Sequence, residues 1–193
     1  MTYLIDYETI ALVFIPLILV IYASAILSAK KKNKLCKEYI VEKAKNSAFV
    51  IYIIFIIAVT LFPILIPPED PDSGFKVINL SFADLVKMWE YNKRIAIVNI
   101  GGNIALFIPF VILGRLNNYR AFHSFKRCIV LSVILILLIE GAQYLEMTLG
   151  LAASPRTADI IDVVCNTIGV VVGWMLYSLL LKNKIQQKGN LIL

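Results

Sequence analysis

Hydrophobic residues fall into five long stretches along the chain, separated by short polar segments. Each stretch approaches the roughly 20 residues that an α-helix needs to cross a hydrocarbon core of about 30 Å. The stretches are Ile10 to Ala29, Phe49 to Ile66, Ile95 to Gly114, Cys128 to Leu149, and Ile160 to Leu181. The pattern predicts an all-α fold, an integral membrane helical bundle of about five transmembrane helices.

The composition agrees with this prediction. Of the 193 residues, 60% are hydrophobic and 17% are charged, which excludes a water-soluble domain of ordinary composition. The first apolar stretch has the length of a signal peptide, but the residues before it include Asp6 and Glu8 and no lysine or arginine. We therefore expect this stretch to remain as a helix in the membrane.

The charged residues are distributed unevenly between the segments that connect the apolar stretches. Lysine and arginine in short loops resist translocation and stay in the cytoplasm. They gather in segments 30–45 and 115–127 and in the tail after residue 181, whereas the N-terminus and segments 67–94 and 150–159 are acidic or mixed. We expect the N-terminus outside the cell and the C-terminus in the cytoplasm. Because the net charge of +6 is accounted for by these loops, the lipid bilayer is the expected partner and nucleic acid is not.

Two local patterns predict further helical features. Ser81 and Asp84 have the spacing of a capping box, and the apolar residues after Ser81 recur at helical spacing. We expect a short helix on the outer membrane surface, either as a lid or as a cover packed on the bundle. In the fifth stretch, Gly169 and Gly173 form a G-x-x-x-G pair, which favours close approach to another helix of the same bundle.

Polar residues inside the last three apolar stretches carry the functional information, because ionisable groups at membrane depth usually face a cavity or a partner. Within each stretch they are three, four or seven residues apart and so share one helix face. They are Asn99 and Asn103 in the third stretch, with Gly102 on the same face, Glu140 and Gln143 in the fourth, and Asp159, Asp162 and Asn166 at the start of the fifth, just after the loop residue Arg156. With alternating helix directions, all three groups fall at the same depth. The sequence therefore predicts a polar pocket on the outer side of the membrane.

Three interpretations of this pocket stay open. In the first, it is a structural network in which Arg156 pairs with Asp159 or Asp162 and the amides bridge helices. In the second, it binds or transports an amine-bearing or cationic head group. In the third, it is catalytic: Glu140 acts as general acid or base, Asp159 and Asp162 orient the reacting groups, and Arg156 holds an anion. Asn99, Asn103, Gln143, Arg156 and Asn166 are the candidate substrate-binding residues. No metal ligands and no cofactor are assigned.

These residues, in this order and spacing, resemble the pattern of the VanZ-like family of bacterial membrane proteins over roughly residues 50 to 181. The matching motifs are Asn99-x3-Asn103-x3-Phe107-x-Pro109-Phe110, Glu140-x2-Gln143, and Arg156-x2-Asp159-x2-Asp162-x3-Asn166-x2-Gly169. Val111 departs from the pattern, since members often have glycine at that position. The resemblance implies a plasma-membrane protein of a family associated with low-level resistance to glycopeptide antibiotics, teicoplanin in particular.

The resemblance also suggests a division of the chain. We expect an N-terminal transmembrane helix and basic cytoplasmic loop over residues 1–45, a VanZ-like four-helix membrane domain over 46–182, and a cytoplasmic tail over 183–193. We expect the protein to act at the cell envelope, where its pocket binds or modifies a lipid-linked or cell-wall component. The alternative is a membrane binding, transport or structural protein whose polar cluster only holds the bundle together. The pattern does not indicate an oligomeric state.

Overall fold

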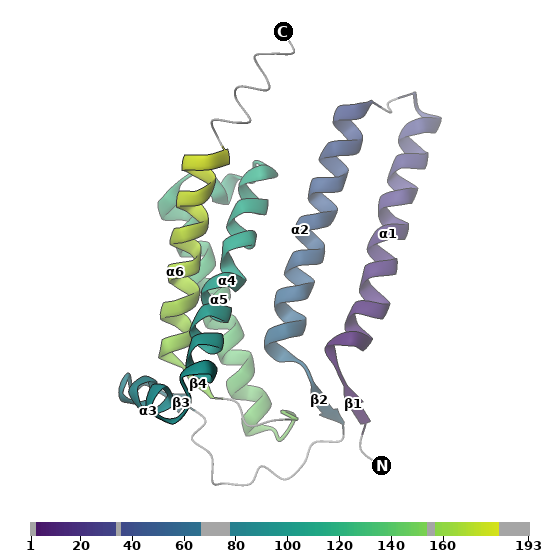
Figure 1. The fold of residues 1–193 in the computed structure, drawn as a ribbon. Helices are drawn as coiled ribbons and strands as arrows, with labels where there is room; N and C mark the ends of the chain where they lie inside the picture. Colours follow the sequence, from purple (N-terminus) through teal and green to yellow (C-terminus); the bar gives the residue numbers. More distant parts are fainter. Residues whose placement is uncertain (1–2, 34–35, 67–77, 154–156, 182–193) are drawn as a thin grey trace. The chain divides into compact units, whose positions relative to one another are not determined.

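The computed structural model describes residues 3–33, 36–66, 78–153 and 157–181, and these residues form a predominantly helical structure (Figure 1). Five of the described helices are long and apolar enough to cross a membrane, which confirms the predicted fold class. They are α1 (Tyr7–Lys31), α2 (Lys37–Leu61), α4 (Lys93–Leu116), α5 (Phe125–Thr148) and α6 (Ile160–Leu176), which η2 (Tyr177–Leu181) continues. The inside or outside position of each loop stays a prediction.

The first helix begins directly after Asp6. The Asp6 carboxylate accepts hydrogen bonds from the backbone N–H and the hydroxyl of Thr9, both at 2.8 Å, and so caps the N-terminus of α1. The N–H bond, with the hydroxyl bond second, holds the pKa of Asp6 below its ordinary value. The acidic residue ahead of the first apolar stretch is therefore a helix cap.

The second helix ends earlier than its apolar stretch. We expected the span to reach Ile66, but α2 ends at Leu61, and Phe62 is extended with φ −102° and ψ 152°. The residue after Phe62 is Pro63, which has no N–H and disfavours a helical conformation in the residue before it. The apolar residues that follow form strand β2 (Ile64–Ile66).

The structure contains two compact units, and α5 contributes residues to both. The first unit comprises Met1–Asn79 and Leu138–Ala158, and the second comprises Leu80–Leu137 and Asp159–Leu193. In the first unit, α1 and α2 form an antiparallel hairpin (Figure 1). Strand β1 (Tyr3–Ile5) precedes this hairpin and pairs antiparallel with β2 after it.

The segment after α5 is fixed to the same end of this hairpin. The N–H of Leu65 donates to the carbonyl of Leu151 at 2.8 Å, and Ile64 forms a β-bridge with Ala152. The C-terminal end of α5 therefore lies beside β2 within the first unit. A second small sheet pairs β3 (Ile78–Asn79) with β4 (Ala158–Asp159).

The second unit is built on α4 and α6, which run parallel. A Cβ atom added at Gly169 would collide with the carbonyl oxygen of Ile104, and one at Gly173 would lie 2.8 Å from that of Ile108. The two glycines therefore let the backbones of α4 and α6 approach each other closely. This contact confirms the predicted use of the G-x-x-x-G pair within the bundle.

The second unit also contains the predicted short helix, α3 (Ala83–Tyr91), which packs on α4. The N-cap of α3 is Phe82, one residue later than the capping-box spacing predicted, and the hydroxyl of Ser81 accepts a hydrogen bond from the N–H of Ala83 at 3.2 Å. The exposed apolar side chains Phe82, Val86 and Trp89 form the expected stripe. A short turn of 3-10 helix, η1 (Arg120–Phe122), connects α4 to α5.

Candidate functional site

A chain of hydrogen bonds joins α4 to α6 near the N-terminal ends of both helices. The side-chain amide of Asn103 donates to the amide oxygen of Asn99 at 3.0 Å and to the carboxylate of Asp162 at 2.6 Å. Both N–H groups of Asn103 are used in these two bonds, which fixes the orientation of its amide. The structure therefore brings together three of the residues that the sequence selected.

Two capping residues fix where α4 and α6 begin, a short distance before the residues of this hydrogen-bond chain. The side chain of Asn92 accepts hydrogen bonds from the N–H groups of Arg94 and Ile95 and starts α4. The Asp159 carboxylate accepts a hydrogen bond from the N–H of Ile161 at 2.8 Å and starts α6. Asp159, predicted as a catalytic residue, thus has a structural role at the helix start.

The polar face of α6 continues inward to Asn166, one turn beyond Asp162. Asn166 is buried, and its amide oxygen has no hydrogen-bond partner among the described residues. Asn103 and Asp162 are partly buried and Asn99 is exposed. We call Asn99, Asn103, Asp162 and Asn166 the amide–carboxylate cluster. It extends from an exposed end to a buried, unpaired acceptor, an arrangement that native proteins rarely keep without a partner.

The candidate residues of the fourth apolar stretch, Glu140 and Gln143, lie in the part of α5 that belongs to the first unit. The amide of Gln143 donates to the backbone carbonyl of Thr60 at 3.0 Å, and Glu140 is buried. Thr60 lies in the last turn of α2, where carbonyl groups lose their helical partners because the helix ends ahead of Pro63. The Gln143 side chain therefore caps the C-terminal end of α2. Arg156, the predicted anion-binding residue, lies outside the described residues.

Among the described residues, no group of three or more histidine, cysteine, aspartate or glutamate side chains could hold a metal ion. The cluster on α4 and α6 combines amides with one carboxylate. Its available atoms include two hydrogen-bond acceptors, the second oxygen of Asp162 and the amide oxygen of Asn166, and the exposed amide N–H groups of Asn99. The arrangement suits a ligand that donates hydrogen bonds, such as an ammonium or hydroxyl group.

Comparison with known families decides the identity of the chain. The model of the VanZ/LLP1 family matches residues 49–181, which include the cluster, Gln143 and Glu140. The chain belongs to the VanZ-like family. It is a multi-pass membrane protein of that family, and the matched range agrees with the one expected from the motifs. Comparison with curated proteins and with solved structures gives no match.

The structure of this VanZ-like protein also contains a site that the sequence did not reveal. The guanidinium of Arg115 lies 3.7 Å from the ring centroid of Trp174 and 4.3 Å from that of Tyr177. It donates to the hydroxyl of Ser178 at 2.7 Å. We call these four residues the arginine clamp. It joins the C-terminal ends of α4 and α6, and the sequence suggested Arg115 only as a loop charge.

A buried carboxyl group was also missed. Glu146 in α5 is 7% exposed, and it lies three residues beyond Gln143. In this stretch the sequence pattern indicated Glu140 and Gln143, and Glu146 was not considered. The VanZ-like protein therefore buries two acidic side chains, Glu140 and Glu146, in the part of α5 that belongs to the first unit.

Proposed function

We propose that this VanZ-like protein acts at the cell envelope by binding a lipid-linked or cell-wall component through the amide–carboxylate cluster, and so contributes to glycopeptide resistance. The observation that carries the proposal is the geometry at Asn103. Both of its N–H groups are bonded within the protein, while Asp162 and Asn166 keep acceptor atoms for a ligand. An ammonium or hydroxyl group of a head group or precursor complements these acceptors.

The loop charges support the location of this site. The basic segments 30–45 and 115–127 favour the cytoplasmic side, which puts the start of α4 and the start of α6 on the outer side. Cell-wall components and glycopeptides are encountered on that side. A change to one lipid or precursor there would alter susceptibility without transport of the antibiotic.

Catalysis is an extension of the same proposal. Within the cluster, the Asp162 carboxyl group would act as acid or base, with Asp159 at the start of the same helix. Glu140 and Gln143 belong to the first unit, and Arg156 lies outside the described residues, so their catalytic and substrate-binding roles are a separate prediction. Binding has the stronger support, because the hydrogen bonds of Asp159 and Gln143 serve helix ends.

A purely structural function is the second candidate, and one observation favours it. The bond between Asn103 and Asp162 links two packed helices, and interhelical hydrogen bonds in membranes contribute about 0.6 kcal/mol on average. A contribution of this size makes the bond a minor part of the stability of the bundle. The test must therefore separate loss of function from loss of folded protein.

The test is teicoplanin susceptibility of a sensitive Gram-positive host that expresses the wild type, Asp162→Asn or Glu140→Gln, with the membrane abundance of each measured in parallel. Asp162→Asn removes the charge but keeps an oxygen that accepts from Asn103. We expect the wild type to lower susceptibility and Asp162→Asn to lose that effect at equal abundance.

The other outcomes discriminate between the candidates. Equal protection by Asp162→Asn would show that the cluster is not the active element. Collapse of its abundance would favour the structural candidate. Loss of protection in Glu140→Gln at normal abundance would add support for catalysis. If the wild type does not protect, the resistance function does not apply to this member of the family.

A further inference from the structure

Asn166 faces α4 from a position between two contacts of α4 with α6. It lies four residues after Asp162, which bonds Asn103, and three residues before Gly169, where the two backbones approach closely. Residues at this spacing share one helix face, and helical side chains lean toward the N-terminus of their helix. The Asn166 side chain, which is 4% exposed, is therefore directed toward Asp162. Its amide oxygen forms no hydrogen bond among the described residues, so it is a buried acceptor directed into the amide–carboxylate cluster.

The inner end of the cluster offers three acceptor oxygens. Both N–H groups of Asn103 donate within the protein, which leaves its amide oxygen as an acceptor. Asp162 has a second carboxylate oxygen and forms no ion pair among the described residues, and Asn166 supplies the third oxygen. A primary ammonium group has three N–H donors, a positive charge and no acceptor. It therefore matches this end in both charge and donor number, whereas a hydroxyl group supplies one donor and a quaternary ammonium group none.

The outer end of the cluster has the opposite hydrogen-bonding character. The oxygen of Asn99 accepts from Asn103, so the exposed N–H groups of Asn99 stay available to donate. They lie one helical turn, about 5.4 Å, before the acceptors. In a phosphoethanolamine group, five bonds of about 1.5 Å join a free phosphate oxygen to the ammonium nitrogen and span a comparable distance. One such group therefore complements both ends of the cluster.

The residues beside Asn99 favour a lipid as the source of this group. Ile97 and Val98 are 57% and 66% exposed, so the membrane covers the turn of α4 that carries Asn99. The loop charges favour the outer side for the starts of α4 and α6, where the head groups of the outer leaflet lie.

We propose that the amide–carboxylate cluster binds the phosphoethanolamine head group of a membrane lipid, with the primary ammonium at Asp162, Asn103 and Asn166 and the phosphate at Asn99. The three inner acceptors, one of them buried, and the donors one turn outward carry the proposal. It rests on the proposed function, because it names the head group that the cluster takes.

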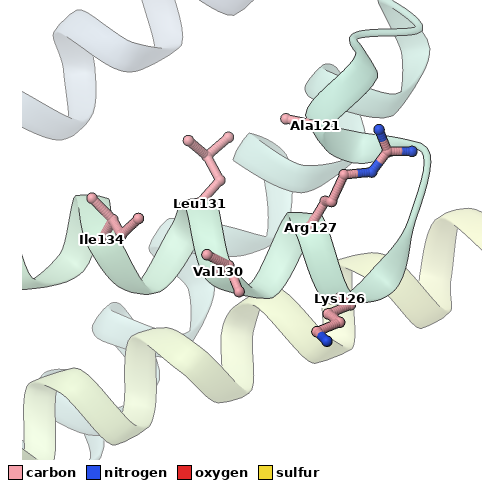
Figure 2. Close-up of a pocket in the computed structure, with 6 residues that line it drawn as sticks. All are labelled: Ala121, Lys126, Arg127, Val130, Leu131 and Ile134. Atoms are coloured by element: carbon pink, nitrogen blue, oxygen red, sulfur yellow. The ribbon is translucent and has the colours of Figure 1, made fainter.

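The hollow at the start of α5 has no comparable set of polar atoms (Figure 2). It measures about 390 Å³ and is lined by Ala121, Lys126, Arg127, Val130, Leu131 and Ile134. Figure 2 shows Lys126 and Arg127 on opposite sides of the helix end, so they do not converge on one group. Lipid held there by apolar contact would not depend on its head group, so a variant of this hollow is a suitable control.

The test is native mass spectrometry of the full-length protein with phosphatidylethanolamine, its N-methyl and N,N-dimethyl derivatives, and phosphatidylcholine, all with the same acyl chains. These head groups keep one positive charge but supply three, two, one and no N–H donors. We expect retention to fall about fivefold with each methyl group, since each removes about one hydrogen bond. Asp162→Asn should lower retention of phosphatidylethanolamine about tenfold or more, because it removes the charged acceptor.

Asn166→Leu separates ligand binding from a structural role. Leucine has a similar size but no acceptor, so retention of phosphatidylethanolamine should fall about fivefold. The N-methyl derivative should then bind as well as phosphatidylethanolamine, because two donors suffice for two acceptors. Thr167→Val is the matched control, since the Thr167 hydroxyl donates to Val163 of its own helix. It should leave the whole methylation series unchanged, as should Arg127→Gln in the hollow.

Four results would overturn the proposal. Equal retention of all four lipids, or an unchanged series in Asp162→Asn, would show that the cluster does not read the ammonium group. Displacement of phosphatidylethanolamine by an equal concentration of soluble phosphoethanolamine would show that a lipid is not the preferred ligand. Retention that appears only in Arg156→Gln would assign the Asp162 carboxylate to the guanidinium of Arg156.

This experiment separates the proposal from the proposed function, because lipid retention is measured without cells. The expected methylation series, together with no protection by the wild type, would reject the resistance function and leave the head-group assignment standing. Protection that requires Asp162 without any lipid selectivity would reject the head-group assignment alone.

Discussion

Helices α1 and α6 are both apolar enough to cross a membrane, yet they differ in what their side chains contact. In the apolar window of α1, 6% of residues are buried within the structure, against 33% in α6. Leu12 of α1 is 75% exposed, whereas Cys165, Asn166 and Val170 of α6 are buried. Hydropathy therefore identifies both helices as membrane spans but does not distinguish one that faces lipid from one that forms a core.

The hydrogen bonds of polar side chains also differ between α1 and the pair of helices α4 and α6. In α1, the hydroxyl of Ser24 donates to the carbonyl of Ile21 in its own helix at 2.8 Å. Between α4 and α6, Asn103 bonds Asp162 and Arg115 bonds Ser178 across the two helices. Where no water is available, a polar side chain either bonds its own backbone or bridges to a neighbour. The polar side chains of α4 and α6 therefore contribute to the contact between these two helices.

The largest effect is expected at the closest approach of α4 and α6. Gly169→Val would place side-chain atoms against the backbone of Ile104, which cannot move without separating the helices. We expect a loss of about 3 kcal/mol of stability, at the upper end for overpacked cores, measured as the unfolding free energy of the purified protein in detergent.

Gly102→Ala is the matched control, because a Cβ atom at Gly102 meets nothing within 4 Å. It should leave stability unchanged or raise it by up to about 1 kcal/mol, since alanine is the better helix former. A large loss at Gly102, or none at Gly169, would contradict the close approach of α4 and α6 at Gly169.

The arginine clamp should give the next largest effect. Arg115→Lys keeps the charge but loses the planar contact with Trp174 and Tyr177, and lysine cannot reproduce the geometry of the guanidinium. We expect a loss of about 2 kcal/mol in the same unfolding measurement, from the cation–π contacts and the hydrogen bond. Arg120→Lys, an exposed arginine near the same helix end, should be neutral. An equal effect of both changes would mean that the clamp contributes no more than a surface charge.

The smallest effect is expected on α1. Leu12→Ala truncates a side chain that is 75% exposed. Within the membrane, the substitution therefore changes contacts with lipid and removes few contacts within the protein. We expect a change below about 0.5 kcal/mol. Ile56→Ala in α2, a side chain that is 1% exposed, is the buried counterpart and should cost about 2 kcal/mol or more. A large effect at Leu12 would show that α1 packs against a partner.

The sequence predicted the features that depend on periodicity. Five apolar stretches appeared as five helices, and the positions of Asn99, Asn103 and Asp162 on their helix faces predicted that they would meet. The partner of Gln143 was not predictable, because it is a backbone carbonyl of Thr60 that becomes available only where Pro63 ends α2. The arginine clamp was missed because Arg115 is charged and close to a loop, and nothing in the pattern shows that two aromatic rings of α6 will flank it.

We propose that Asp162 serves a ligand and contributes little to the packing of the bundle. Comparing the unfolding free energy of purified Asp162→Asn with that of the wild type tests it most directly. Because asparagine still accepts the hydrogen bond from Asn103, we predict a difference of no more than about 0.6 kcal/mol, although the variant loses its protective effect in cells. A loss of about 3 kcal/mol or more would show instead that Asp162 is a structural residue of the α4 and α6 contact.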